Sequence, residues 1–312
     1  MALDVGIVGL PGSGKTGLFN ALTHGVASEH ELKEHVGMAT IADERLDQLA
    51  PIERARKVTP ATIRVVDVPG TGPALLGNLR RSDALLAVVS DDDDLENLKL
   101  ELLVADRDHV EKRLERVRSQ AKSGDPKLRQ EVTDLEELLK HVEAGGTVAD
   151  SGRPVPPELE PLTTKPLVVV VNGTEPATRD SASPVLGIDL ELEEELAQLD
   201  DEEAAAFREG GSSALEEVVL RLKEALDLIA FFTVGEQEAR AWTLRRGQSA
   251  FDAAESIHTD IARGFIRCEV INWHDLVEAG SRAEVAKRGQ QRLEGKDYIV
   301  ADGDVLNIRF NV

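Results

Sequence analysis

The chain has 312 residues, and its 41% hydrophobic and 30% charged content is typical of a soluble globular protein large enough for more than one domain. Its single cysteine, Cys268, excludes an intrachain disulfide and indicates a reducing, cytoplasmic location. No apolar run approaches the ~20 residues of a membrane span, so no membrane partner is expected. The net charge of −22 lies mostly in the first 230 residues. The negative charge of this part argues against DNA binding and against non-specific RNA binding. It does not exclude a specific RNA contact elsewhere in the chain.

The first third of the chain alternates apolar strands with helical patterns. The runs at 4–10, 62–70 and 83–90 are rich in Val, Ile and Leu, and VVVVN at 168–172 resumes the same rhythm. Near-continuous apolar runs flanked by glycine are typical of a parallel sheet that helices cover on both faces. The sequence therefore predicts an α/β fold.

A glycine-rich motif follows the first predicted strand. The stretch GLPGSGKT at 9–16 fits G-x-x-x-x-G-K-[ST] in full and precedes an apolar helical pattern, which is the context this motif requires. Lys15 is expected to reach the β- and γ-phosphates of a nucleotide, and Thr16 to bind Mg²⁺. The predicted nucleotide-binding residues here are Gly9, Gly12, Ser13, Gly14, Lys15, Thr16 and Gly17.

The same glycines offer a competing interpretation. Residues 12–17 also fit G-x-G-x-x-G, the dinucleotide fingerprint, which requires an acidic residue at the end of the next strand. Glu31 and Glu34 have roughly that spacing, but no β-run precedes them. The phosphate-loop interpretation is therefore favoured.

The second predicted strand ends in VVDVPG, with the D-x-x-G pattern at 67–70. Asp67 is expected to hold Mg²⁺ through a water, and the Gly70 N–H to reach a γ-phosphate. Some 50 residues after a phosphate loop, this pattern indicates a switch NTPase. Lys15, Asp67 and Gly70 are the predicted catalytic residues, and Thr16 and Asp67 the metal ligands.

Residues 95–145 interrupt the sheet pattern. Leu103, Val110, Leu114 and Val117 lie on one helical face, SGDP at 123–126 makes a turn, and a second apolar stripe runs from Leu128 to Val142. Asp125 is the predicted N-cap of the second helix, with Pro126 at its first position. These patterns predict an antiparallel helical hairpin.

The strand at 168–172 ends in NGTE, where Ras-type GTPases carry Asn-Lys-x-Asp. Asn172, Gly173 and Glu175 are the predicted base-binding residues. A short Asp accepts two adjacent N–H groups of guanine, whereas the longer Glu175 would misplace its carboxylate for that pair. The Asn172 amide can instead meet adenine N6 and N7, so ATP is predicted and GTP is less favoured.

The C-terminal part, residues 231–312, has a different pattern of predicted strands and helices. The patterns predict strands at 238–247, 266–273, 296–304 and 305–312 and a helix at 249–265, which together form a small α+β module. The predicted domains are a nucleotide-binding domain at 1–94 and 160–230, a helical insertion at 95–159, and a C-terminal module at 231–312.

With these motifs together, the chain resembles the Obg-like ATPases of the YchF family. The stretches that carry the resemblance are GIVGLPGSGKTGLFNALT, LELLVADRDHVEKRLERV and most of residues 231–312, which match the family's TGS, ubiquitin-like module. The family carries Asn-x-x-Glu and prefers ATP, as NGTE predicts. The resemblance implies Mg²⁺-dependent ATP hydrolysis and the ribosome as partner, through its RNA or its proteins.

Three departures from the family pattern affect catalysis. The family has a Thr before NVG in its first switch, but the matching LKEHVG at 32–37 has none. The loop after D-x-x-G is shortened, with Thr71 where Ras-type enzymes have Gln. VLGIDLELE at 185–193 replaces the usual Ser-Ala-Lys. The leading hypothesis is a slow ATP-dependent switch protein. The alternatives are a nucleotide-binding protein without hydrolysis and a true GTPase.

Overall fold

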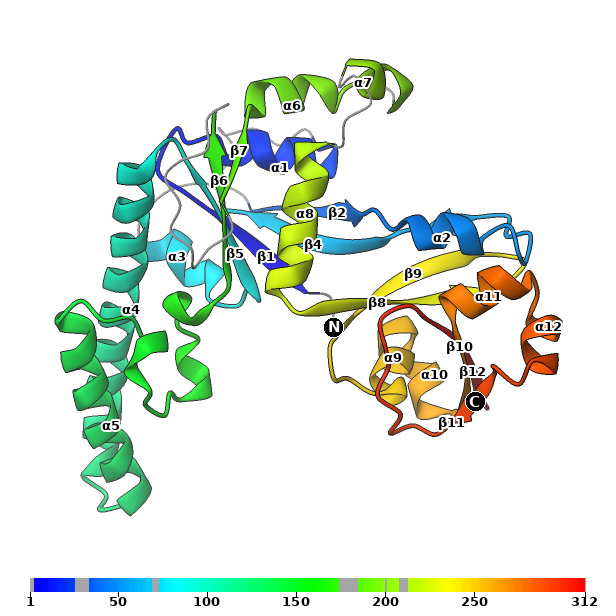
Figure 1. Cartoon of the computed structure of the whole chain (residues 1–312). Coiled ribbons are helices and arrows are strands. Elements are labelled where there is room, and N and C mark those ends of the chain that lie inside the picture. The colour runs from blue at the N-terminus through cyan, green and yellow to red at the C-terminus, as the bar shows by residue number, and fades with distance from the viewer. Residues whose placement is uncertain are drawn as a thin grey trace. The chain divides into compact units, whose positions relative to one another are not determined.

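The computed structural model describes residues 3–25, 34–68, 73–173, 185–199, 201–207 and 213–311. The chain divides into two compact units. One comprises residues 4–37 and 65–210, and the other residues 1–3, 38–64 and 211–312. Each unit combines a sheet with helices (Figure 1), which confirms the predicted α/β class with a C-terminal α+β module.

The first sheet has six strands in the order β2-β4-β1-β5-β6-β7, and β1, β5, β6 and β7 run parallel. Its strands are β1 (Asp4–Val8), β2 (His35–Ile41), β4 (Ala61–Asp67), β5 (Ala84–Val89), β6 (Leu167–Asn172) and β7 (Val185–Ile188). Every residue of β5 is buried, as expected for a central strand covered on both faces. Because β1 and β6 are parallel, their carboxyl ends meet at one edge, where nucleotide sites lie in such folds.

The helices of this unit include a long hairpin. The helices are α1 (Lys15–Thr23), α3 (Pro73–Leu79), α4 (Asp92–Ala121), α5 (Pro126–Glu143), α6 (Leu190–Leu196) and α7 (Asp201–Phe207). The helices α4 and α5 pack side by side (Figure 1) through a core that includes Val110, Leu114, Leu135 and Leu138. The hairpin prediction is confirmed.

Local signals set the ends of the hairpin helices. Asp91 caps α4 by accepting the Asp94 N–H at 2.9 Å, and three aspartates occupy the first turn, where the helix dipole favours negative charge. Asp125 caps α5 through the Lys127 N–H at 2.9 Å, with Pro126 at the first helical position, as predicted. Because capping involves only residues close in sequence, the Asp125 cap could be predicted without the fold, and the Asp91 cap is added by the structure.

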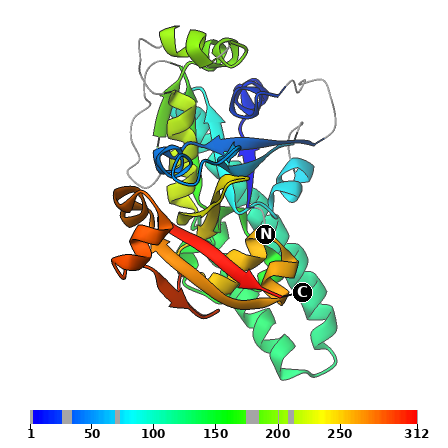
Figure 2. The ribbon, with the colours of Figure 1, turned by 90° about the vertical axis from the view of Figure 1, so that its right-hand side faces the viewer.

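The second unit has a mixed sheet in the order β11-β10-β12-β8-β9-β3. The antiparallel pairs are β8–β9, β10–β12 and β10–β11, whereas β12–β8 and β3–β9 are parallel. Figure 2 shows β12 in red beside β10 in orange. The strands are β3 (Val58–Thr59), β8 (Leu228–Val234), β9 (Ala239–Arg245), β10 (Phe265–Asn272), β11 (Arg292–Glu294) and β12 (Asp304–Phe310).

Six helices of the second unit lie within the described residues. They are α2 (Glu44–Leu49), α8 (Ala214–Ala225), α9 (Ala250–Ile257), α10 (Thr259–Arg263), α11 (Trp273–Ala279) and α12 (Arg282–Lys287). Ala250 and Ala253 of α9 pack against Phe231, Val270 and Leu306 in one core. Residues 38–64 are tied to the C-terminal module, since Thr59 Oγ1 donates to Glu238 Oε1 at 2.5 Å and Arg45 Nη1 to Asp302 Oδ2 at 2.7 Å.

Two local predictions in this unit were wrong. The single helix expected at 249–265 is broken at His258, whose extended backbone ends α9 and whose Nδ1 accepts the Asp260 N–H to begin α10. The strand expected at 296–304 is a turn with one isolated bridge at Ile299. Its backbone is bonded locally and not in a strand ladder, because Asp304 Oδ2 accepts the Ala301 N–H, Val300 N–H donates to the Gln248 carbonyl and the Tyr298 carbonyl accepts the Ala250 N–H.

Candidate functional site

The phosphate loop connects β1 to α1, as the motif requires. Gly12 and Gly14 have φ of +78° and +100°, the left-handed region that glycine adopts without strain. A Cβ on Gly9 would overlap the Val88 carbonyl of β5, so this position is restricted to glycine by close backbone approach. The sequence folds here into a glycine turn leading into a helix N-terminus, the arrangement that favours anions.

Lys15 begins α1 and turns back over the loop. Its Nζ donates to the carbonyls of Gly9 at 3.0 Å and Leu10 at 2.9 Å. These contacts hold the Lys15 ammonium group against the backbone of the phosphate loop. The ammonium group therefore lies against the loop that the motif predicts to bind phosphate.

Thr16 and Asp67 meet beneath the loop although 51 residues separate them. Thr16 Oγ1 donates to Asp67 Oδ2 at 3.0 Å, and both residues are buried. The other carboxylate oxygen, Asp67 Oδ1, is buried and has no hydrogen-bond partner among the described residues. A buried carboxylate oxygen without a partner is costly unless a ligand engages it. A hydroxyl beside such an oxygen fits a hard divalent cation.

His35, the first residue of β2, was not predicted as a site residue. Its Nδ1 lies 3.5 Å from Asp67 Oδ2, and its side chain is only 11% exposed. The ring also contacts Phe19 of α1, with 6.0 Å between ring centroids. The available sequence signal was its place in the HVG stretch that matches the family's first switch.

Asn172 ends β6 beside the loop. Its Nδ2 donates to the Ser13 carbonyl at 3.2 Å, so the predicted base-binding residue and the phosphate loop are joined across 159 residues. Gly173 follows with φ of +155°, and its N–H donates to the Ile188 carbonyl of β7 at 2.8 Å. Leu190 of α6 approaches Gly14 from the same side.

The remaining predicted residues are distributed as follows. Gly17 lies in the first turn of α1, near the Glu194 carboxylate of α6. Gly70, Thr71 and Glu175 lie outside the described residues. The structure therefore brings together Lys15, Thr16, Asp67 and Asn172, and it adds His35.

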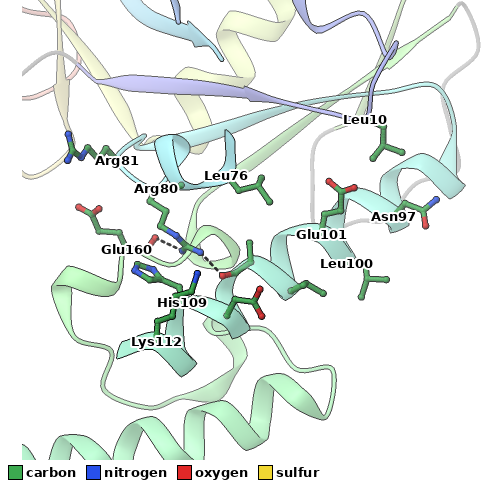
Figure 3. A pocket seen from close by; sticks show the side chains of 14 residues that line it. Leu10, Leu76, Arg80, Arg81, Asn97, Leu100, Glu101, His109, Lys112 and Glu160 are labelled. Atoms are coloured by element: carbon green, nitrogen blue, oxygen red, sulfur yellow. Dashed lines mark hydrogen bonds between the residues drawn. The ribbon is translucent and has the colours of Figure 1, made fainter. Parts of the chain in front are cut away.

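A separate cavity of about 810 Å³ lies between α3 and α4. Leu76 and Arg80 line it from the α3 side, and Leu100 and Val104 line it from α4, as Figure 3 shows for the labelled side chains. Leu10 of the phosphate loop also lines it, but Thr16, His35 and Asp67 are not among its lining residues. The cavity is thus distinct from the site around Thr16.

Fold and site together define a class of protein. A parallel sheet with a glycine loop between β1 and α1, and an Asp–Thr pair beneath that loop, is a P-loop nucleotide-binding domain. No helix within the described ranges is both long and apolar enough to cross a membrane.

Comparisons with known proteins specify the family. A family model described as "50S ribosome-binding GTPase" matches residues 4–132. The model of the YchF GTPase C-terminal domain, described as "Protein of unknown function (DUF933)", matches residues 228–311.

Relatives that match over their whole length indicate the same family. The chain is similar to proteins named "Ribosome-binding ATPase YchF", with 33% identity to that of Bacillus subtilis and 34% to that of Haemophilus influenzae, each over 100% of both chains. It also resembles the solved structure of the Schizosaccharomyces pombe YchF GTPase, with a TM-score of 0.82 and 25% identity over 98% of this chain and 97% of that one. The chain belongs to the YchF family.

Proposed function

We propose that this protein is an Mg²⁺-dependent, ATP-binding switch protein of the cytoplasm that hydrolyses ATP slowly and associates with the ribosome. The observation that carries the proposal is the buried hydrogen bond from Thr16 to Asp67, which leaves one Asp67 oxygen for a ligand. The curated relatives are named ribosome-binding ATPases, which supports ATP and the ribosome as ligand and partner.

Each residue of the loop has a distinct part in this proposal. The backbone N–H groups of residues 12–17 bind phosphate oxygens, and Lys15 exchanges its contacts with the Gly9 and Leu10 carbonyls for the β- and γ-phosphates. Thr16 and Asp67 are the residues that would hold the divalent cation. When bound, Mg²⁺ neutralises charge on the phosphate oxygens.

Selection of the base is assigned to the end of β6. The Asn172 amide, held 3.2 Å from the Ser13 carbonyl, can reach a base seated over the loop. Gly173 has no aliphatic side chain to cover that base, unlike the Lys of Ras-type enzymes. Adenine N6 and N7 offer the Asn172 amide one donor and one acceptor, so ATP is favoured over GTP.

Slow hydrolysis follows from the residues around the γ-phosphate. The first switch lacks the family Thr, Thr71 stands where Ras-type enzymes have Gln, and no Gln is adjacent. Each missing group that positions water or stabilises charge costs ~10²-fold or more in rate. The isolated chain should therefore turn over far below the ~1–100 s⁻¹ of kinases.

Single-turnover hydrolysis of pre-bound ATP, with and without ribosomes, tests the proposal. We expect slow hydrolysis alone and a change in rate or nucleotide affinity with ribosomes. Bound ATP that is never hydrolysed, even with ribosomes, would support the alternative of a binding protein without catalysis. Tighter binding of Mg²⁺·GTP than of Mg²⁺·ATP would support the GTPase alternative.

A further inference from the structure

His35 is placed at the predicted cation site by tertiary structure. Its Nδ1 lies 3.5 Å from Asp67 Oδ2, the same oxygen that accepts the Thr16 hydroxyl at 3.0 Å. The three side chains come from three elements, α1, β2 and β4, within one compact unit. An imidazole nitrogen, a hydroxyl and a carboxylate, all of which can bind a metal ion, therefore lie together at one buried place.

The separations between these donor atoms match those of ligands sharing one cation. Neighbouring ligands at ~2.1 Å from an octahedral ion lie about 3 Å apart. The observed separations of 3.0 and 3.5 Å are close to that value, and 3.5 Å is long for an imidazole–carboxylate hydrogen bond. Asp67 Oδ1, which has no hydrogen-bond partner within the described part of the chain, is a further buried oxygen at this place that could bind a cation.

We propose that His35, which stands where the family has the Asn of NVG, is a ligand of the nucleotide-associated divalent cation in a first switch that lacks the family Thr. The inference rests on the proposed function, since it assumes that a cation binds between Thr16 and Asp67. An imidazole ligand shifts a site of oxygen donors toward transition metals. The site should therefore favour Mn²⁺ over Mg²⁺ more strongly than the same site without His35.

The competing role for His35 is that of a charge partner for Asp67 that never touches the cation. Both roles place the ring beside the carboxylate, so loss of activity on mutation could not distinguish them. A direct spectroscopic signature of a metal–nitrogen bond distinguishes the two roles. Mn²⁺ supplies that signature, because it is paramagnetic and replaces Mg²⁺ in oxygen-donor sites.

The experiment is electron spin echo envelope modulation of Mn²⁺ bound with a non-hydrolysable ATP analogue. Wild-type protein labelled with ¹⁵N-histidine is compared with unlabelled protein, so that histidine nitrogen is separated from adenine nitrogen. Couplings to ³¹P report that the cation sits on the nucleotide. His35→Asn, which restores the family residue, is compared with His274→Asn at an exposed position in the other unit.

We expect ³¹P couplings in all proteins and a histidine nitrogen coupling in wild type and His274→Asn that is absent in His35→Asn. The ratio of Mn²⁺- to Mg²⁺-supported nucleotide affinity should fall by roughly tenfold or more in His35→Asn. Phosphorus couplings without a histidine coupling in wild type would overturn the role of His35 and leave the proposed function standing. Absence of the ³¹P couplings would overturn both.

Discussion

Arg80 and Asp106 form a buried ion pair, with 2.7 Å between Nη1 and Oδ1, that ties the end of α3 to the middle of α4. Asp106 also accepts the N–H groups of Leu162 and Thr163 at 2.9 and 2.8 Å. Arg80 in turn donates to the Ala105 carbonyl at 2.7 Å (Figure 3). One buried polar cluster thus ties α4, at the base of the helical hairpin, to the end of α3 and to residues 162–163.

Arg80→Ala should destabilise the protein strongly. The change leaves the Asp106 carboxylate buried without its counter-charge, and breaking such a pair costs about 3–5 kcal/mol of the free energy of unfolding. Urea denaturation measures the loss. Arg118→Ala is the matched control, because its pair with Glu136 joins α4 and α5 at the surface and should contribute within ~1 kcal/mol. Equal effects of the two changes would contradict this account.

Lys15→Ala should weaken nucleotide binding without unfolding the chain. A charge-assisted contact to phosphate contributes about 1.5–3 kcal/mol, or roughly 10–150-fold in affinity. Calorimetric titration with Mg²⁺·ATP measures the loss, and circular dichroism checks the fold. Lys287→Ala, an exposed lysine of α12, serves as the control. Wild-type affinity and turnover in Lys15→Ala would refute the phosphate assignment.

Asn172→Ala should cost about 1–3 kcal/mol of ATP affinity, or roughly 5–150-fold, if its amide binds the base. The substitution also removes the hydrogen bond to the Ser13 carbonyl, so titration with inorganic triphosphate is needed as a reference. Loss of ATP affinity alone indicates base recognition, whereas equal losses for both ligands would assign Asn172 only to holding the loop.

Glu175→Asp should not create a strong preference for GTP. The shorter carboxylate approaches the GTPase motif, but Gly173 still lacks the aliphatic stem that covers guanine in Ras-type sites. Competition between ATP and GTP for the variant checks this outcome. A switch to tight GTP binding by this single change would mean that the carboxylate length alone determines the base.

Cys268 should make the stability of the protein depend on alkaline pH. Burial in β10 raises the pKa of its thiol from 9.0 to about 12, and nearby acidic side chains add to the effect. Between these values the unfolded chain loses the proton while the folded chain keeps it, so the free energy of unfolding falls as pH rises above about 9.

Urea unfolding at pH 7.5 and 10 measures this dependence. The decrease with pH should be larger in wild type than in Cys268→Ala, which has no thiol to ionise. Native protein should also react slowly with a thiol reagent at pH 8 until urea unfolds it. Rapid modification of folded protein would show that the thiol is accessible.

Features confined to one stretch of chain were determined by the sequence alone. The phosphate loop, the cap at Asp125, and the two apolar stripes of the hairpin all depend on residues within a few positions of one another. Their hydrogen bonds and burial follow from local spacing, so the class of nucleotide-binding domain could be predicted before any coordinate was known.

Only the tertiary structure decided which distant residues meet. The motifs assigned Thr16, Asp67 and Asn172 to one nucleotide site, but only sheet order shows their direct contacts and places His35 beside Asp67. The strand expected at 296–304 is a turn whose backbone bonds to Asp304 and to residues 248–251, and residues 38–64 join the C-terminal unit through β3 and β9. Such contacts depend on long-range strand register, which a single sequence does not encode in any one segment.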